Sequence, residues 1–155
     1  MFALVLVTML PFVWFGMIAA ISFIETPLKF RAPGMTHALG VGIGRLVFKA
    51  LNLTEAALAL IIVVAWTFAG EVVSAVAGAL LILSMAALAL QMLALRPAMS
   101  QRTRTLAQTA VSDRGGAAVK AAVGTGTHIA YMASEALKAV ALPVAGILIV
   151  LEVAS

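Results

Sequence analysis

The sequence lacks cysteine altogether and is poor in charge. Without cysteine, disulfide bonds, thiolate metal ligands and cysteine nucleophiles are excluded. Asp, Glu, Lys and Arg together make up 10% of the 155 residues, against about a quarter in a typical soluble domain. The sequence also lacks the motifs of phosphate-binding loops, dinucleotide folds and nucleophile triads. The composition therefore argues against a soluble enzyme of these classes.

Apolar residues are what the chain has in excess: they make up 64% of it and form four long runs rich in Ala, Leu and Met. About 20 apolar residues suffice to cross a bilayer as a helix. The runs show none of the alternation that is typical of membrane β-strands. We therefore predict an all-α, integral membrane four-helix bundle that forms a single domain over residues 1–155. Its expected spans are about 1–30, 39–70, 72–96 and 118–152.

Basic residues gather at two of the three connections between these spans. Nine of the ten flank the first or the third connection: Lys29, Arg31, Arg45, Lys49, Arg96, Arg102, Arg104, Arg114 and Lys120. Membrane proteins keep such loops in the cytoplasm. The rule predicts cytoplasmic first and third connections, both termini outside, and a location in a bacterial inner membrane. It explains the basic residues without a nucleic-acid partner, so the lipid bilayer is the first partner that we expect.

Two of the predicted spans carry a stripe of polar residues, because side chains three or four positions apart share one face of a helix. In the second span this face bears Arg45, Lys49, Asn52 and Glu55. In the fourth span it bears His128, Tyr131, Glu135 and Lys138. An ionised group that faces lipid near mid-membrane costs at least about 3 kcal/mol. We therefore expect the stripes to face each other or a wet cavity.

The two stripes are expected to meet at a common depth. Fifteen residues separate Glu55 from Glu71, and thirteen separate Lys138 from Glu152. At about 1.5 Å per residue, Glu55 and Lys138 both lie roughly 20 Å from the outer boundary. We predict an ion pair between Lys138 and either Glu55 or Glu135, at the closed end of a polar funnel in the cytoplasmic half. The predicted lining of this funnel is Glu25, Arg45, Lys49, Asn52, Glu55, Gln91, His128, Tyr131, Glu135 and Lys138.

A polar funnel of this kind suits a small anionic or amphipathic ligand, and transport is the function that we expect of it. Proton exchange in the layer of Glu55, Glu135 and Lys138 would gate passage. Two other interpretations are an accessory subunit that docks its polar face onto a larger membrane complex, and charges that only fix the helix register. No metal site is expected, because Lys138 lies among the carboxylates and neither Glu55 nor Glu135 begins the Glu-x-x-His pattern of di-metal bundles.

The pattern Arg45-x6-Asn52-x2-Glu55, at the start of the second of four spans, resembles the motif of the membrane-associated proteins in eicosanoid and glutathione metabolism. Members of that family are oligomeric four-helix proteins that bind glutathione between subunits and conjugate or isomerise lipophilic substrates. The resemblance implies that Arg45, Asn52 and Glu55 help to hold glutathione as a cofactor. A glutathione-dependent transferase or isomerase is therefore the alternative function. The chain departs from the family at Phe48, which replaces an arginine, with Lys49 one place along.

Small residues recur at four-residue spacing in Gly40 and Gly44, and again in Gly70, Ser74 and Gly78. This spacing lets helix backbones approach closely in lipid. It therefore predicts helix-packing faces, either within one subunit or between subunits. A homo-oligomer or a place in a membrane complex is the assembly that we expect.

Overall fold

The computed structural model describes residues 1–95 and 117–155. The first span consists of α1 (Phe2–Ile18), the π-helical segment η1 (Ala19–Glu25) and α2 (Thr26–Lys29), which follow one another without a break. A short connection leads to the long helix α3 (His37–Ala69). Its start is fixed by Thr36, whose hydroxyl oxygen accepts a hydrogen bond from the backbone N–H of Leu39 at 3.2 Å, as is typical of a helix cap.

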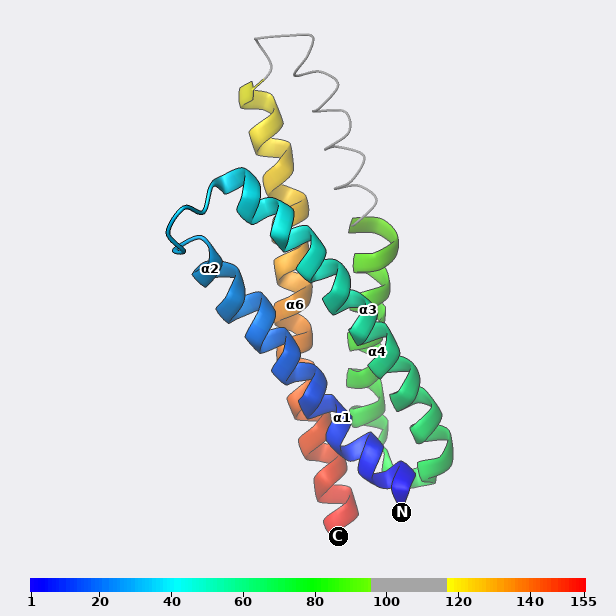
Figure 1. Ribbon diagram of the computed structural model, residues 1–155. Helices are drawn as coiled ribbons and strands as arrows, with labels where there is room; N and C mark the ends of the chain where they lie inside the picture. The colour runs from blue at the N-terminus through cyan, green and yellow to red at the C-terminus, as the bar shows by residue number, and fades with distance from the viewer. Residues whose placement is uncertain (96–116) are drawn as a thin grey trace.

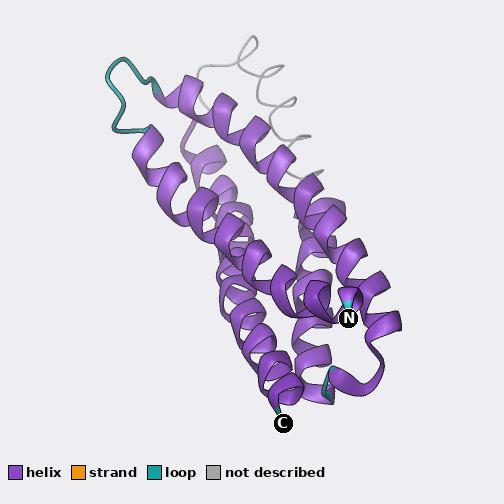
Figure 2. Cartoon of the chain, turned by 60° about the horizontal axis from the view of Figure 1, so that its bottom comes forward, coloured by secondary structure: helices purple, strands orange, loops and turns teal. Residues whose placement is uncertain are grey.

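The second half of the chain begins with a tight turn. The 3₁₀ segment η2 (Gly70–Val72) leads from α3 to α4 (Ala75–Leu90). Gly70 has a φ of 68°, a backbone conformation that favours glycine and allows the chain to reverse here. The π-helical segment η3 (Gln91–Leu95) continues α4, and α6 (Ala117–Ala154) forms the last span. Figure 2 shows the described residues as helices joined by short connections.

Four helical stretches in the described ranges are long and apolar enough to cross a membrane: Phe2–Lys29, Gly42–Ala69, Ala75–Ala94 and Ile129–Ala154. Large apolar side chains cover their outward faces, among them Leu53, Leu60, Leu93 and Val140. Such a surface suits the hydrocarbon of a bilayer better than water. The prediction of an all-α protein with four apolar spans is confirmed, and the described helix ends agree with the predicted ones to within one turn.

The four spans pack so that α6 lies between α1 and α4, while α1 also packs along α3. The consecutive helices α3 and α4 share far fewer contacts with each other. Both chain termini and the turn between α3 and α4 lie at one end of the bundle, and the connection from α2 to α3 lies at the other (Figure 1). The two termini therefore lie at the same end of the bundle.

The apolar core occupies the half of the bundle that is nearer the termini. Val7 of α1, Ile62 of α3, Leu81 of α4 and Ile149 of α6 are all fully buried and belong to one cluster. Each span contributes to this core, and the buried hydroxyl of Thr8 beside it donates to the carbonyl oxygen of Leu4 in its own helix at 2.7 Å. Most of the buried polar residues lie in the other half of the bundle, among them Asn52, Gln91 and Glu135.

Glycines provide close contacts within this single chain. A side chain at Gly40 would overlap the ring of Phe30, and one at Gly44 would lie 3.1 Å from Lys29 Nζ. A side chain at Gly78 on α4 would overlap the edge of the Trp66 ring on α3. The sequence left open whether these small residues pack within or between subunits. In the structure, all three contacts join helices of the same chain.

Gly146→Ala is expected to destabilise the bundle by about 1–2 kcal/mol, because overpacking a tight helix contact forces its neighbours apart. A Cβ at this position of α6 would lie 2.7 Å from two ring atoms of Phe12 on α1. The midpoint of thermal unfolding in detergent measures the effect. Gly42→Ala is the matched control, because nothing lies within 4 Å of its added carbon. Equal midpoints for the two variants would contradict the packing argument.

Candidate functional site

The side chain of Lys138, on α6, is fully buried among oxygen atoms from three helical segments. Its Nζ donates to Glu55 Oε1 at 2.6 Å, to Gln91 Oε1 at 2.8 Å and to Glu135 Oε1 at 2.9 Å. An ammonium group has three N–H bonds, so each of them has an acceptor. Both candidate partners thus pair with Lys138, and the predicted ion pair is confirmed. We call Glu55, Gln91, Glu135 and Lys138 the Lys138 cluster.

Within this cluster, Glu55 is anchored to α1 as well as to α6. The indole Nε1–H of Trp14 donates to Glu55 Oε1 at 2.7 Å, and both side chains are fully buried. The same carboxylate oxygen therefore accepts hydrogen bonds from Trp14 and from Lys138. The second oxygen, Oε2, is buried and has no hydrogen-bond partner.

Glu135 has donors on both of its carboxylate oxygens. Its Oε1 accepts from Lys138 and, at 2.7 Å, from Gln91 Nε2. Its Oε2 accepts from the hydroxyl of Ser22 at 3.0 Å. Hydrogen bonds to an ionised acceptor are about twice as strong as neutral ones, and here both oxygens of the carboxylate accept them.

Gln91 links the cluster to the backbone of α6. Besides its bond to Glu135, its Nε2 donates to the Ser134 hydroxyl oxygen at 2.6 Å, and the Ser134 hydroxyl donates to the carbonyl oxygen of Tyr131 at 2.7 Å. The carbonyl of Gln91 accepts from Lys138. A neutral amide that donates and accepts here satisfies the charges without adding another one.

Two of the cluster's donors come from π-helical segments. Ser22 lies in η1, and Gln91 is the first residue of η3. A π-helical turn holds one more residue than an α-helical turn, and such segments occur frequently at functional sites. Pro27, which lacks an N–H, follows η1 by two residues, and Pro97 follows η3 at the same distance in the sequence. The Thr26 hydroxyl donates to the carbonyl oxygen of Ile21 at 3.0 Å, so this backbone carbonyl of the widened turn gains a side-chain hydrogen bond.

A second polar contact lies one turn earlier on α3. The hydroxyl of Tyr131 donates to Asn52 Oδ1 at 2.8 Å, and Asn52 is fully buried. The ring of Tyr131 meets that of Phe48 edge to face, with centroids 5.3 Å apart. Asn52 Nδ2 is buried and, like Glu55 Oε2, lacks a hydrogen-bond partner.

The ten residues that we predicted as a funnel lining divide into separate groups. Glu55, Gln91, Glu135 and Lys138, together with Asn52 and Tyr131, are buried. Arg45 and Lys49, on the same stripe of α3, are exposed. Long basic side chains extend readily to a membrane interface. The described residues thus form a closed, buried cluster instead of the lining of an open funnel.

Two further residues of the predicted lining, Glu25 and His128, are not found in the Lys138 cluster. Glu25 Oε2 accepts from Lys29 Nζ at 3.2 Å. The side chain of Lys29 is 8% exposed, and its Nζ lies 5.6 Å from the ring centroid of Phe48. This lysine, the last residue of α2, is therefore largely buried against α3, although it lies beside the first connection in the sequence. The side chain of His128 lies outside the described part of the structure.

Sequence reasoning missed three members of the polar network, namely Trp14, Ser22 and Ser134. None of these three side chains carries a charge that would mark it in the sequence. One available signal was the presence of polar groups inside apolar spans, because such groups need partners in lipid. That signal shows which residues require a partner but not which partner they find.

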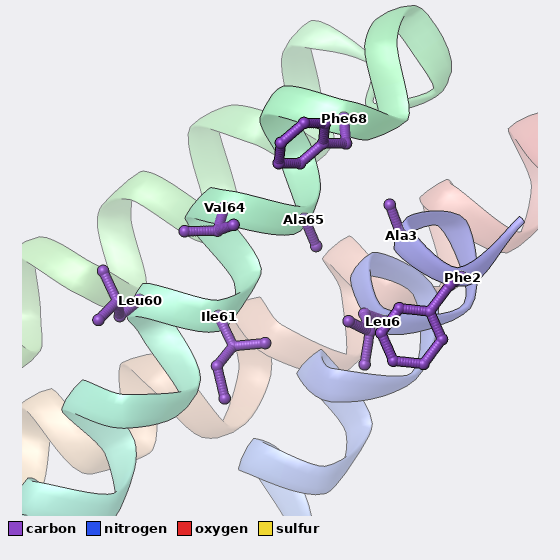
Figure 3. Close-up of a pocket in the computed structure, with 8 residues that line it drawn as sticks. All are labelled: Phe2, Ala3, Leu6, Leu60, Ile61, Val64, Ala65 and Phe68. Carbon is purple, nitrogen blue, oxygen red and sulfur yellow. The ribbon is translucent and has the colours of Figure 1, made fainter.

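An apolar pocket of about 400 Å³ lies between the start of α1 and the later half of α3 (Figure 3). Its lining residues are Phe2, Ala3, Leu6, Leu60, Ile61, Val64, Ala65 and Phe68. It lies towards the end of the bundle that carries the N-terminus, and no residue of the Lys138 cluster lines it. A pocket without polar groups offers nothing that would orient a polar ligand, so the cluster is the better candidate site.

The described residues do not contain a cluster of side chains suited to binding a metal ion. Residues 1–95 and 117–155 bring no three His, Asp or Glu side chains together in a way that could hold a metal ion, within the side chains described. In the Lys138 cluster, the space between the two carboxylates is occupied by an ammonium group. The chemistry that the cluster does allow is the exchange of protons between its ionisable groups.

No family model matches the sequence, and searches of the curated proteins and of the solved structures find no match. The observed geometry therefore carries the functional argument by itself. The chain is a helical membrane protein with four apolar spans and a buried polar cluster formed by Glu55, Gln91, Glu135 and Lys138.

Proposed function

We propose that the protein is a proton-coupled transporter of small anionic or amphipathic solutes and that the Lys138 cluster is its exchange site. One observation carries the proposal. The ammonium of Lys138 is fully buried in the membrane-spanning bundle, between the carboxylates of Glu55 and Glu135. Ionisable groups inside membrane spans are rare, and they mark ion pathways and proton relays in pumps and transporters.

Stability alone is a weak reason for such a cluster. Replacing a buried ion pair by well-packed apolar residues is often neutral or stabilising. The rest of the core shows that this chain packs apolar residues well, with Leu81, Leu142 and Ile149 fully buried. A costly group of charges among such residues therefore favours a functional role.

The charges of the cluster suit proton exchange. Two ionised carboxylates and one ammonium leave an excess of one negative charge, which the binding of one proton removes. A protonated carboxyl group holds Lys138 less strongly, since charge-assisted hydrogen bonds are about twice as strong as neutral ones. The ammonium is then able to attract the carboxylate or phosphate of a solute. Proton uptake and anion binding are coupled in this scheme.

Passage through the bundle requires the cluster to open, because its members are buried in this conformation. The segments η1 and η3 are suitable places for such a change. Both supply donors to Glu135, through Ser22 and Gln91, and a shift of either segment towards α-helical register withdraws its donor. The basic residues beside the connection between α2 and α3 favour a cytoplasmic location for it. A solute from that side reaches the cluster before it meets the apolar core.

Proton flux into liposomes tests the proposal. Purified protein is reconstituted with a pH-sensitive dye inside, and lactate, succinate or glutathione is added outside under an inward proton gradient. Glutathione is included because of the Arg45-x6-Asn52-x2-Glu55 pattern. We expect at least one of these anions to accelerate acidification of the lumen. Glu55→Gln and Glu135→Gln should each slow that flux by roughly tenfold or more, because each removes one of the two carboxylates that pair with Lys138 in the exchange site.

Glu152→Gln is the matched control, since Glu152 is exposed near the end of α6. It should transport like the unmodified protein. Anion-dependent flux that is equal in Glu55→Gln, Glu135→Gln and Glu152→Gln would overturn the proposed site. The lack of any anion- or gradient-dependent proton flux in the unmodified protein would overturn the transport function.

A further inference from the structure

The two carboxylates that hold Lys138 differ in how completely their oxygens are hydrogen-bonded. Glu135 accepts from three donors, Lys138, Gln91 and Ser22, and both of its oxygens are used. Glu55 accepts from two donors, Lys138 and Trp14, and both bonds reach the same oxygen. Its Oε2 is buried without a partner.

We infer that Glu55 is the group that takes up and releases the proton, while Glu135 remains the permanent counter-ion of Lys138. The inference rests on the proposed function only in assuming that the cluster exchanges a proton. A bare, buried carboxylate oxygen is costly when it is charged. A proton on Glu55 Oε2 neutralises that oxygen without breaking the bonds that Oε1 accepts. A proton on Glu135 would instead disturb an oxygen that already accepts a hydrogen bond.

Asn52 is placed to serve both protonation states of Glu55. It lies three residues earlier on α3, so its side chain is a neighbour of Glu55 on the helix surface. Its Nδ2 is buried and unpartnered, while its Oδ1 accepts from the hydroxyl of Tyr131. An amide offers a donor on one side and an acceptor on the other. A small shift of the side chain would let Nδ2 donate to ionised Glu55, and a half-turn of the amide would present Oδ1 to the protonated form. Asn52 is therefore a positioning residue.

The groups that face Glu55 from the surrounding helices support this division of roles. From α6, Lys138 and Glu135 are the charged groups near it, and Tyr131 adds a hydroxyl one turn away. From α1 and η3, Trp14 and Gln91 contribute neutral donors to the cluster. The acidic and basic groups in contact with this network are thus Glu55, Glu135 and Lys138, among the side chains described.

Trp14 provides a direct reporter, because its indole N–H donates to Glu55 and not to Glu135. The sequence contains two tryptophans, and Trp66→Phe leaves Trp14 as the only one. Protonation of Glu55 turns a charge-assisted bond into a neutral one, which weakens the indole bond. Fluorescence and ultraviolet resonance Raman spectra of Trp14 respond to such a change.

The test is a pH titration of the Trp66→Phe protein in lipid nanodiscs, with infrared detection of protonated carboxyl groups in parallel. We expect the Trp14 signal to change together with the infrared band of a protonated acid. The transition should disappear in Trp66→Phe with Glu55→Gln. With Glu135→Gln it should persist, since Glu135 is not the group that titrates.

Carboxyl protonation without any change at Trp14 would overturn the inference, and so would a Trp14 transition that survives Glu55→Gln. The first of these outcomes needs no carboxyl variant, so it does not depend on whether Glu135→Gln folds. Failure of the proposed function looks different. In that case the Trp14 transition is present while the liposomes show no proton flux.

Discussion

Replacing Lys138 by methionine is expected to lower the free energy of unfolding by about 3–5 kcal/mol, because breaking a buried ion pair leaves uncompensated charge behind. The change places the carboxylates of Glu55 and Glu135 in a dry interior without their shared counter-ion. Methionine has a similar length and fills the space of the aliphatic part of lysine. The loss of stability is therefore due to the missing charge and not to a cavity. Thermal unfolding in detergent, followed by circular dichroism, measures it.

A triple variant separates charge from packing. Lys138→Met combined with Glu55→Gln and Glu135→Gln removes all three charges while keeping side chains of similar size. Buried ion pairs replaced by apolar residues are often as stable as the original, and the glutamine carbonyls introduced here are still able to accept the hydrogen bonds of Trp14 and Ser22. We expect the triple variant to unfold near the temperature of the unmodified protein and to show no proton flux. If it is as unstable as Lys138→Met alone, the charges of the cluster do not account for the loss.

Gln91→Leu is expected to lower the free energy of unfolding by about 3 kcal/mol, because hydrogen bonds to charged groups contribute about 1.5–3 kcal/mol each to stability. The substitution removes the acceptor of one Lys138 N–H and the donor to Glu135 Oε1. It also leaves the Ser134 hydroxyl oxygen without the donor at 2.6 Å. Leucine fills most of the volume, so the expected loss reflects unsatisfied polar groups. The midpoint of thermal unfolding is again the measurement.

Leu93→Val is the control for Gln91→Leu. Leu93 lies in the same segment, η3, but is 78% exposed. A change of one methylene on a lipid-facing surface is expected to leave the unfolding midpoint nearly unchanged. If both variants unfold together, the hydrogen bonds of Gln91 contribute nothing measurable to the bundle.

The roles of Gln91 and Ser22 show why the site was only partly predictable. Gln91 was recognised in the sequence as a polar residue at membrane depth, whereas Ser22 was not. Both reach Glu135 from π-helical segments, in which the residue positions depart from the spacing of a regular helix. A prediction that assumes 3.6 residues per turn, as for an α-helix, places such side chains on the wrong face.

The stripe on α3 illustrates the same limit. Asn52 and Glu55 are buried, yet Arg45 and Lys49 are exposed, although helical spacing puts all four on one face. A face about 100° wide contains residues at both of its edges. Which edge turns inward depends on how the neighbouring helices cross, and spacing within one helix does not specify that.

The sequence by itself determined that the chain is a four-span helical membrane protein. Polar groups are costly in lipid, so spanning helices must be long and apolar, and both properties can be read from composition. It also determined that Glu55 and Lys138 lie at one level, since the rise per residue of a helix is fixed. Only the tertiary structure decided that Trp14, Ser22 and Ser134 complete the network and that Glu55 keeps an unpartnered oxygen. These contacts join residues far apart in the chain, so they depend on the rotation and crossing of whole helices.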